Sequence, residues 1–130
     1  MTKTIADAIV AHCLKGLPDE ACGLFGGDVS NAIVRDLYLS ENMAHSALIY
    51  TVDPKVHLRA DRDAEGKGGG ILGVFHSHTH TEAYPSPTDV AQAPDPSWHY
   101  VIVSLRSDVA SMRSFTIIGG VVSEEAIEIL

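Results

Sequence analysis

A continuous apolar run over residues 71–75 leads directly into His76-Ser77-His78, and it constrains the fold more than any other segment. A run of this length and composition is typical of a central strand that is buried on both faces. Because residues i and i+2 of a strand point to the same side, His76 and His78 are placed to reach one ion. The sequence therefore predicts a buried strand that delivers two imidazoles to one face of a sheet.

A third candidate ligand, Asp89, follows His78 by eleven residues. It ends the sequence Ser86-Pro87-Thr88-Asp89, which has the form of a capping box at the start of a helix. Two imidazoles and a carboxylate suit zinc, although manganese, iron and nickel fit the same donors. Three protein ligands and a water are typical of a catalytic zinc site, whereas four protein ligands make a closed structural site. The pattern therefore favours a hydrolase.

His80 continues the alternation of His76 and His78 and is a possible further ligand. Such a run of three histidines is similar to that of metallo-β-lactamase-like hydrolases. Their pattern has an aspartate at the position of His80 and a histidine at that of Thr81, and their chains are longer. We therefore place His80 on the rim of the site.

Length and charge narrow the class of protein. At 130 residues the chain is predicted to form a single domain, residues 1–130. It is too short for a metal-dependent (β/α)₈ hydrolase, which needs about 250 residues. Its formal net charge of −8 disfavours nucleic acid and anionic membranes as partners, since both attract a basic face. The first residues lack the apolar region of a signal peptide, and we expect a cytoplasmic protein.

Strands and helices interleave along the chain, which predicts an α/β fold with a mixed sheet and helices on its faces. Cys13 and Cys22 are expected to be small buried hydrophobes rather than a disulfide. A capping box is predicted at Thr4, and a turn over residues 26–28. Helices are expected to begin near residues 4, 54 and 87, and strands to cover residues 21–25, 32–39, 48–52, 71–75, 100–105, 111–118 and 121–122.

Two more residues carry chemistry that such a site needs. Glu20 precedes the first predicted strand, where position alone indicates an exposed loop carboxylate. A zinc hydrolase, however, needs a base that takes a proton from water and then returns it to the leaving amine, and a glutamate beside the metal does both. Ser86 is predicted to cap the helix with its oxygen, which leaves its hydroxyl hydrogen free to donate to a developing oxyanion.

Together these residues resemble the JAMM motif of the JAB/MPN/Mov34 (MPN+) zinc metalloproteases. The match comprises His76-x-His78, seven intervening residues, Ser86-x-x-Asp89, and Glu20 upstream of a Cys-Gly-Leu strand. It covers nearly the whole chain and is similar to the small bacterial branch of the family.

The resemblance implies both a fold and a role for each residue. The fold would be a cytidine deaminase-like α/β/α sandwich with a mixed β-sheet flanked by helices. His76, His78 and Asp89 would hold one zinc ion per chain. Glu20 would activate the water and shuttle its proton, and Ser86 would stabilise the oxyanion.

The resemblance also implies a substrate. The scissile bond would be the amide after the C-terminal Gly-Gly of a ubiquitin-like sulfur-carrier protein, with release of cysteine for cysteine biosynthesis. Thr79 and Tyr84 are expected to line the leaving-group side, and residues 48–52 to offer a strand edge to the Gly-Gly tail. The short loop over residues 94–99 fits a small leaving group. Two alternatives are a broader isopeptidase for ubiquitin-like proteins and an inactive MPN scaffold, although such scaffolds lack the metal ligands.

Overall fold

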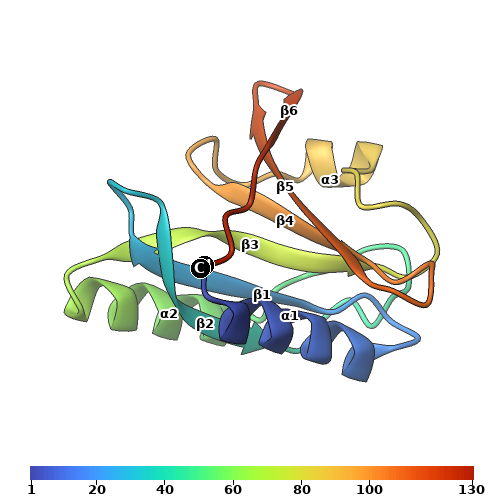
Figure 1. Cartoon of the computed structure of the whole chain (residues 1–130), viewed down its shortest axis with the longest axis horizontal. Coiled ribbons are helices and arrows are strands. Elements are labelled where there is room, and N and C mark those ends of the chain that lie inside the picture. The colour runs from blue at the N-terminus through green and yellow to red at the C-terminus, as the bar shows by residue number, and fades with distance from the viewer.

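The computed structural model describes residues 1–130, and a six-stranded mixed sheet forms its centre (Figure 1). The strands are β1 (Cys22–Asp28), β2 (Ile33–Ser40), β3 (Gly70–His78), β4 (His99–Ser104), β5 (Ser111–Ile118) and β6 (Val121–Glu125). Their order across the sheet is β2-β1-β3-β4-β5-β6, and only β3 and β4 run parallel. The predicted central strand is thus β3, which has neighbours on both sides.

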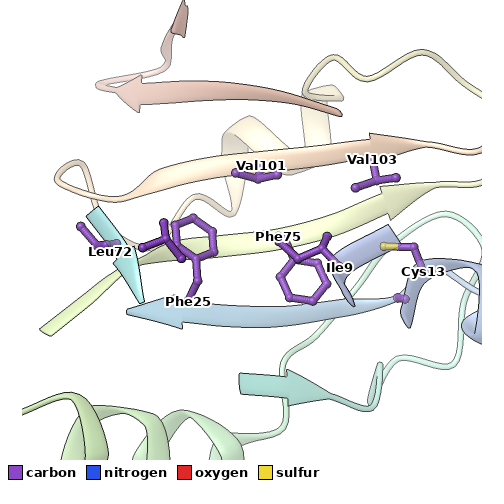
Figure 2. Close-up of a cluster of buried hydrophobic side chains, with 9 residues drawn as sticks. Ile9, Cys13, Phe25, Leu72, Phe75, Val101 and Val103 are labelled. Atoms are coloured by element: carbon purple, nitrogen blue, oxygen red, sulfur yellow. The ribbon is translucent and has the colours of Figure 1, made fainter. Parts of the chain in front are cut away.

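Helix α1 (Lys3–Gly16) covers one face of the sheet. Its buried Ile9 and Cys13 join a core cluster with side chains from β1, β3 and β4 (Figure 2). The helix begins at Thr2, whose side chain accepts a hydrogen bond from the Ile5 amide, so the capping box predicted at Thr4 is wrong by two residues. The sheet residues of this cluster include Phe25, Leu72, Phe75, Val101 and Val103.

Helix α2 (Pro54–Gly66) covers the opposite face and begins after Asp53, as predicted. Its buried Ala60 packs against Leu24 and Val74, which alternate with the residues that face α1. His76 follows Val74 by two positions on β3, so both imidazoles of the motif lie on the α2 face. The short helix α3 (Pro87–Ala91) lies between β3 and β4 in the chain. This arrangement confirms the predicted α/β fold with helices flanking a mixed sheet.

The turn predicted over residues 26–28 is wrong, because β1 continues through Asp28. The pairing register shifts after Phe25 on the β3 side and after Gly26 on the β2 side, where Leu72 of β3 and Arg35 of β2 are extra residues, so the bulges lie on the two strands that flank the glycines. At Gly27, φ is 154° and a Cβ would collide with the carbonyl oxygen of Ile33. The chain reverses after Asp28 instead.

The strand predicted over residues 48–52 is also wrong, and the sheet edge expected there for a Gly-Gly tail is absent. The segment forms a loop with one isolated antiparallel bridge, between Asn42 and Val52. Its main-chain groups bond to a side chain instead of a neighbouring strand: Asn42 accepts from the Thr51 amide and donates to the Ile49 carbonyl. We call residues 42–52 the strap.

Cys13 and Cys22 are free and buried, as predicted. Burial raises the pKa of each thiol to about 12, so both stay protonated near neutral pH. No helix has the length and apolar character needed to cross a membrane.

Candidate active site

The three predicted metal ligands converge at the carboxyl end of β3. Nε2 of His76 lies 3.1 Å from Nε2 of His78, and Oδ2 of Asp89 lies 3.2 Å and 3.0 Å from these two atoms. Ligands at the corners of a tetrahedron with bonds of about 2.0–2.1 Å to zinc lie about 3.3 Å from one another. The observed triangle therefore fits three of the four corners around a zinc ion.

His78 is oriented by a second contact on the far side of its ring. Its Nδ1 lies 2.8 Å from the carbonyl oxygen of Glu82, to which it donates. In the neutral ring this leaves Nε2 without a proton, so its lone pair points at the cluster. Burial acts to lower the pKa of His78, but bonds to Asp89 and to the Glu82 carbonyl raise it on balance.

The start of α3 directs Asp89 toward the histidines. The Asp89 amide donates to Oγ of Ser86 at 3.0 Å, and the Ser86 amide donates to Oδ2 of Asp89 at 2.9 Å. This is the predicted capping box. Burial acts to raise the pKa of Asp89, but the contacts with His76 and His78 outweigh it, so the pKa is lowered and the carboxylate stays charged.

Glu20 is buried, with 4% of its surface exposed, so the alternative of an exposed loop carboxylate is excluded. Its Oε1 has no hydrogen-bond partner. Burial raises the pKa of Glu20 from 4.5 to about 7, while His78 acts to lower it and Asp89 to raise it further. A carboxylate with an unpartnered oxygen and a pKa near 7 is suited to accept and return a proton.

The main chain of Glu20 is held by the strap and by β3. Its amide donates to the Ser46 carbonyl at 2.8 Å, and its carbonyl accepts from Nδ2 of Asn42 at 2.9 Å. The next amide, that of Ala21, donates to Oγ of Ser77 at 2.8 Å. Ser77 lies between the two histidines of the motif in the chain. Glu20 and the metal ligands are therefore connected by short, fixed segments of backbone.

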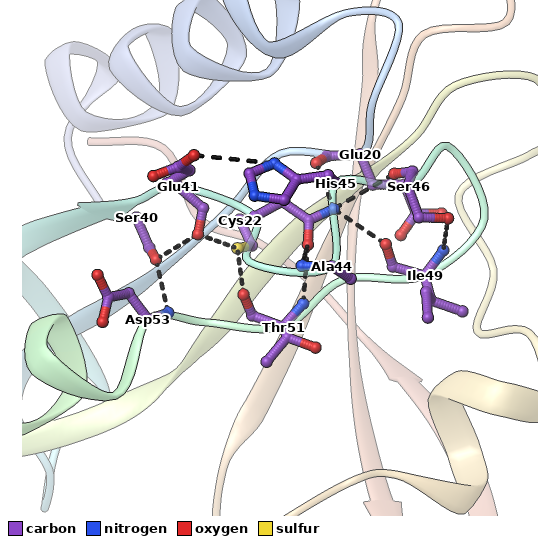
Figure 3. A network of polar contacts seen from close by, with 11 residues as sticks. Glu20, Cys22, Ser40, Glu41, Ala44, His45, Ser46, Ile49, Thr51 and Asp53 are labelled. Atoms are coloured by element: carbon purple, nitrogen blue, oxygen red, sulfur yellow. Dashed lines mark hydrogen bonds and ion pairs between the residues drawn. The ribbon is translucent and has the colours of Figure 1, made fainter.

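Two residues of the strap, Asn42 and Tyr50, are not predicted from the sequence. Asn42 is 7% exposed, and its side chain bonds to main-chain groups of Glu20, Ile49 and Thr51, three residues of the polar network in Figure 3. Tyr50 stacks on the ring of His76, with centroids 4.2 Å apart and planes inclined by 19°. No periodicity or motif marks either residue, because both act through the folded path of a loop.

The remaining predicted residues occupy different places. Thr79 is buried, and its hydroxyl donates to the Ala47 carbonyl of the strap at 3.4 Å. Tyr84 is 45% exposed, and its ring packs edge-to-face on Phe115 at 5.4 Å. Their roles on the leaving-group side stay predictions. His80 is exposed and lies outside the ligand cluster, which agrees with a place on the rim.

The sequence of this chain matches a known protein family. Residues 2–118 match the model of the prokaryotic homologs of the JAB domain. The chain belongs to the JAMM/MPN family. It is thus a JAMM-type metallopeptidase, and its cluster of His76, His78 and Asp89 is consistent with a zinc site.

Within the JAMM family, several curated proteins are similar to this chain. The CysO-cysteine peptidases of Mycobacterium tuberculosis and Mycobacterium bovis are 38% identical over 128 residues, covering 97% of this chain and 87% of theirs. The desampylase of Haloferax volcanii is 30% identical over 103 residues, covering 75% of this chain and 74% of its own.

Solved structures share the fold of this chain. A protein from Desulfitobacterium hafniense, 37% identical, superposes with a TM-score of 0.90 over 99% of this chain and 90% of its own. A JAB1/MPN domain protein from Archaeoglobus fulgidus superposes with a TM-score of 0.64 over 97% of this chain and 92% of its own. At 18% identity, the second likeness shows the fold alone.

Proposed function

We propose that this protein is a zinc-dependent peptidase that hydrolyses the amide after the C-terminal Gly-Gly of a ubiquitin-like sulfur-carrier protein and releases cysteine. The observation that carries the proposal is the triangle of His76, His78 and Asp89, with ligand atoms 3.0–3.2 Å apart. The 38% identity to CysO-cysteine peptidases over 97% of the chain supports the choice of substrate.

In this proposal residues 1–130 act as one catalytic domain, and each residue of the motif has one task. His76, His78 and Asp89 hold the ion. When bound, zinc lowers the pKa of a water to about 7 and polarises the scissile carbonyl. The carbonyl of Glu82 keeps His78 in the tautomer that binds a cation, and the Ser86 amide aims the Asp89 carboxylate.

Glu20 moves the proton. Its unpartnered Oε1 accepts a proton from the attacking water as the new C–O bond forms at the glycine carbonyl. The hydroxyl of Ser86 donates to the oxygen that gains charge, because the helix cap uses only its acceptor side. Glu20 then returns the proton to the nitrogen as the C–N bond breaks, which leaves a Gly-Gly carboxylate and a free amine.

The test is direct cleavage. A ubiquitin-like carrier ending in Gly-Gly-Cys is incubated with the zinc-loaded protein, and the products are read by mass spectrometry. We expect loss of the mass of one cysteine residue, and we expect no loss with Glu20→Gln or after chelation. An intact conjugate after incubation with fully metallated protein would contradict the substrate. Undiminished cleavage by Glu20→Gln would contradict the base.

A second candidate is a broader deconjugase that removes ubiquitin-like proteins from lysine side chains. The relatives from Haloferax volcanii and Thermus thermophilus, a desampylase and a probable TtuB-protein conjugate cleaving protease, favour it. The bond chemistry is the same in both cases, so a competition assay separates the two. Faster cleavage of a Gly-Gly-lysine isopeptide than of the cysteine conjugate would favour the broader activity.

A further inference from the structure

The two histidines of the metal site are supported differently. A metal-ligating histidine ordinarily donates its other ring N–H to a carboxylate, a carbonyl or water, and this contact fixes the ring. His78 follows the rule through its contact of 2.8 Å with the Glu82 carbonyl. His76 has no such contact with the protein, because its Nδ1 is buried and no other residue bonds to it. The orientation of the His76 ring therefore needs another cause.

The ring of Tyr50 lies against the ring of His76. The two centroids are 4.2 Å apart and the planes are inclined by only 19°, so the rings are stacked. A stack of this kind restricts tilting of the imidazole out of its plane and favours apolar contact over its face. His76 is 1% exposed, so the stack is part of a closed environment.

The side chain of Asn42 holds the main chain of the strap on both sides of Tyr50. Oδ1 of Asn42 accepts from the Thr51 amide at 3.0 Å, and Nδ2 of Asn42 donates to the Ile49 carbonyl at 2.9 Å. These two residues flank Tyr50 in the chain. The same Nδ2 donates to the carbonyl of Glu20 at 2.9 Å, so one buried side-chain amide joins the proposed base to the segment that carries Tyr50.

We propose that Tyr50 is a positioning residue that fixes the His76 ring for metal binding, in place of a hydrogen bond to the protein, and that Asn42 keeps Tyr50 there. The inference rests on the proposed metal site but not on the proposed substrate. It is tested by metal affinity, which is measured without substrate, so its failure is distinguishable from failure of the cleavage assay.

The first test compares Tyr50→Phe with Tyr50→Leu. Zinc affinity is measured by competition with a chromophoric chelator, and the ligand geometry is followed by the visible spectrum of the Co²⁺-loaded protein. Tyr50→Phe keeps the aromatic face, and we expect zinc affinity within about twofold of wild type and an unchanged spectrum. Tyr50→Leu removes the stack, and we expect affinity to fall about 10- to 100-fold, the usual cost of losing an outer support, with an altered spectrum. Wild-type affinity and spectrum in Tyr50→Leu would overturn the role of Tyr50.

The second test compares Asn42→Ala with Ser40→Ala. Ser40 is a matched control: it is 3% exposed, and its hydroxyl accepts from the Asp53 amide at 2.9 Å, just beyond the strap. We expect weaker zinc binding and an altered Co²⁺ spectrum only in Asn42→Ala. Equal losses in both variants, or none in Asn42→Ala, would overturn the role of Asn42. If Asn42→Ala does not fold, Asn42→Asp replaces it, because it keeps the acceptor for Thr51 and loses the donor, and the same two outcomes decide.

Discussion

The Nε2 atoms of His76 and His78 face each other across 3.1 Å, and Oδ2 of Asp89 lies within 3.2 Å of both. Nδ1 of His78 donates a hydrogen bond to the Glu82 carbonyl. The other ring nitrogen, Nε2, therefore has a free lone pair, which points at the Asp89 carboxylate. Two groups that each offer electron pairs are held together when a cation lies between them. A shared cation would therefore account for two imidazoles and one carboxylate that are buried side by side.

His78→Ala removes one corner of the proposed metal site. We expect zinc content after dialysis to fall from one ion per chain to well below one, because only two protein ligands remain. Elemental analysis by mass spectrometry checks this result. His80→Ala is the matched control, since His80 is exposed and lies outside the cluster, and it should retain full zinc content. Full zinc content in His78→Ala would contradict the assignment.

Glu20→Gln removes the proposed base without changing the size of the side chain. We expect kcat to fall by about 10²–10⁴, the usual contribution of general acid–base catalysis, while zinc content stays unchanged. Steady-state kinetics with a Gly-Gly-Cys conjugate, together with metal analysis of the same sample, checks both parts. Asp19→Asn, one position earlier in the chain, should have wild-type kcat. A loss of zinc in Glu20→Gln would instead make Glu20 part of the metal support.

The buried Glu20 carboxyl should also make stability depend on pH. Burial raises its pKa from 4.5 to about 7, so the metal-free folded state binds a proton there more tightly than the unfolded state does. The free energy of unfolding therefore falls as pH rises from 4.5 to 7, and the full cost, about 3 kcal/mol, is present above pH 7.

The glutamine in Glu20→Gln cannot ionise, so the free energy of unfolding of this variant should not fall as the pH rises from 4.5 to 7. We expect metal-free Glu20→Gln to be more stable than wild type at pH 8 by about 3 kcal/mol, the full cost of the shift, and similar to wild type at pH 4. Urea denaturation of both proteins at the two pH values measures the difference. A stability difference that does not change between pH 4 and pH 8 would contradict the raised pKa.

Ser86 caps α3, and we propose that it also stabilises the oxyanion, so one substitution has two readouts. In Ser86→Ala the cap is lost, and we expect the free energy of unfolding to fall by about 1 kcal/mol. Loss of the proposed oxyanion donor should lower kcat by about 10²–10³ as well. Thermal unfolding and steady-state kinetics measure the two effects. Ser86→Thr keeps both the acceptor and the donor and should restore most of each; a wild-type kcat in Ser86→Ala would contradict the catalytic role.

The parts of the site that the sequence predicts are those with a local cause. The strand β3 is a continuous apolar run, and its period places His76 and His78 on one face. The capping box of Ser86 and Asp89 is a local pattern that fixes the carboxylate within one helical turn. These residues are therefore found where the motif places them.

The parts that the sequence does not predict depend on contacts between distant segments. The strap has no periodicity, because the amide of Asn42 replaces a strand partner for Ile49 and Thr51. Gly26 and Gly27 have the composition of a turn, yet they continue β1, where glycine is needed because β2 approaches Gly27 too closely for a Cβ. Burial of Glu20 likewise follows from the tertiary path of its neighbours and cannot be recognised from its position before a strand.

We propose that two imidazoles and one carboxylate bind a single zinc ion and leave one corner for water. X-ray absorption at the zinc edge of the metal-loaded protein tests it most directly, because it counts the ligand atoms and their types. We expect two imidazole nitrogens and two oxygens at about 2.0–2.1 Å, one oxygen from Asp89 and one from water. A sulfur ligand, a third imidazole or a fourth protein donor in place of water would contradict it.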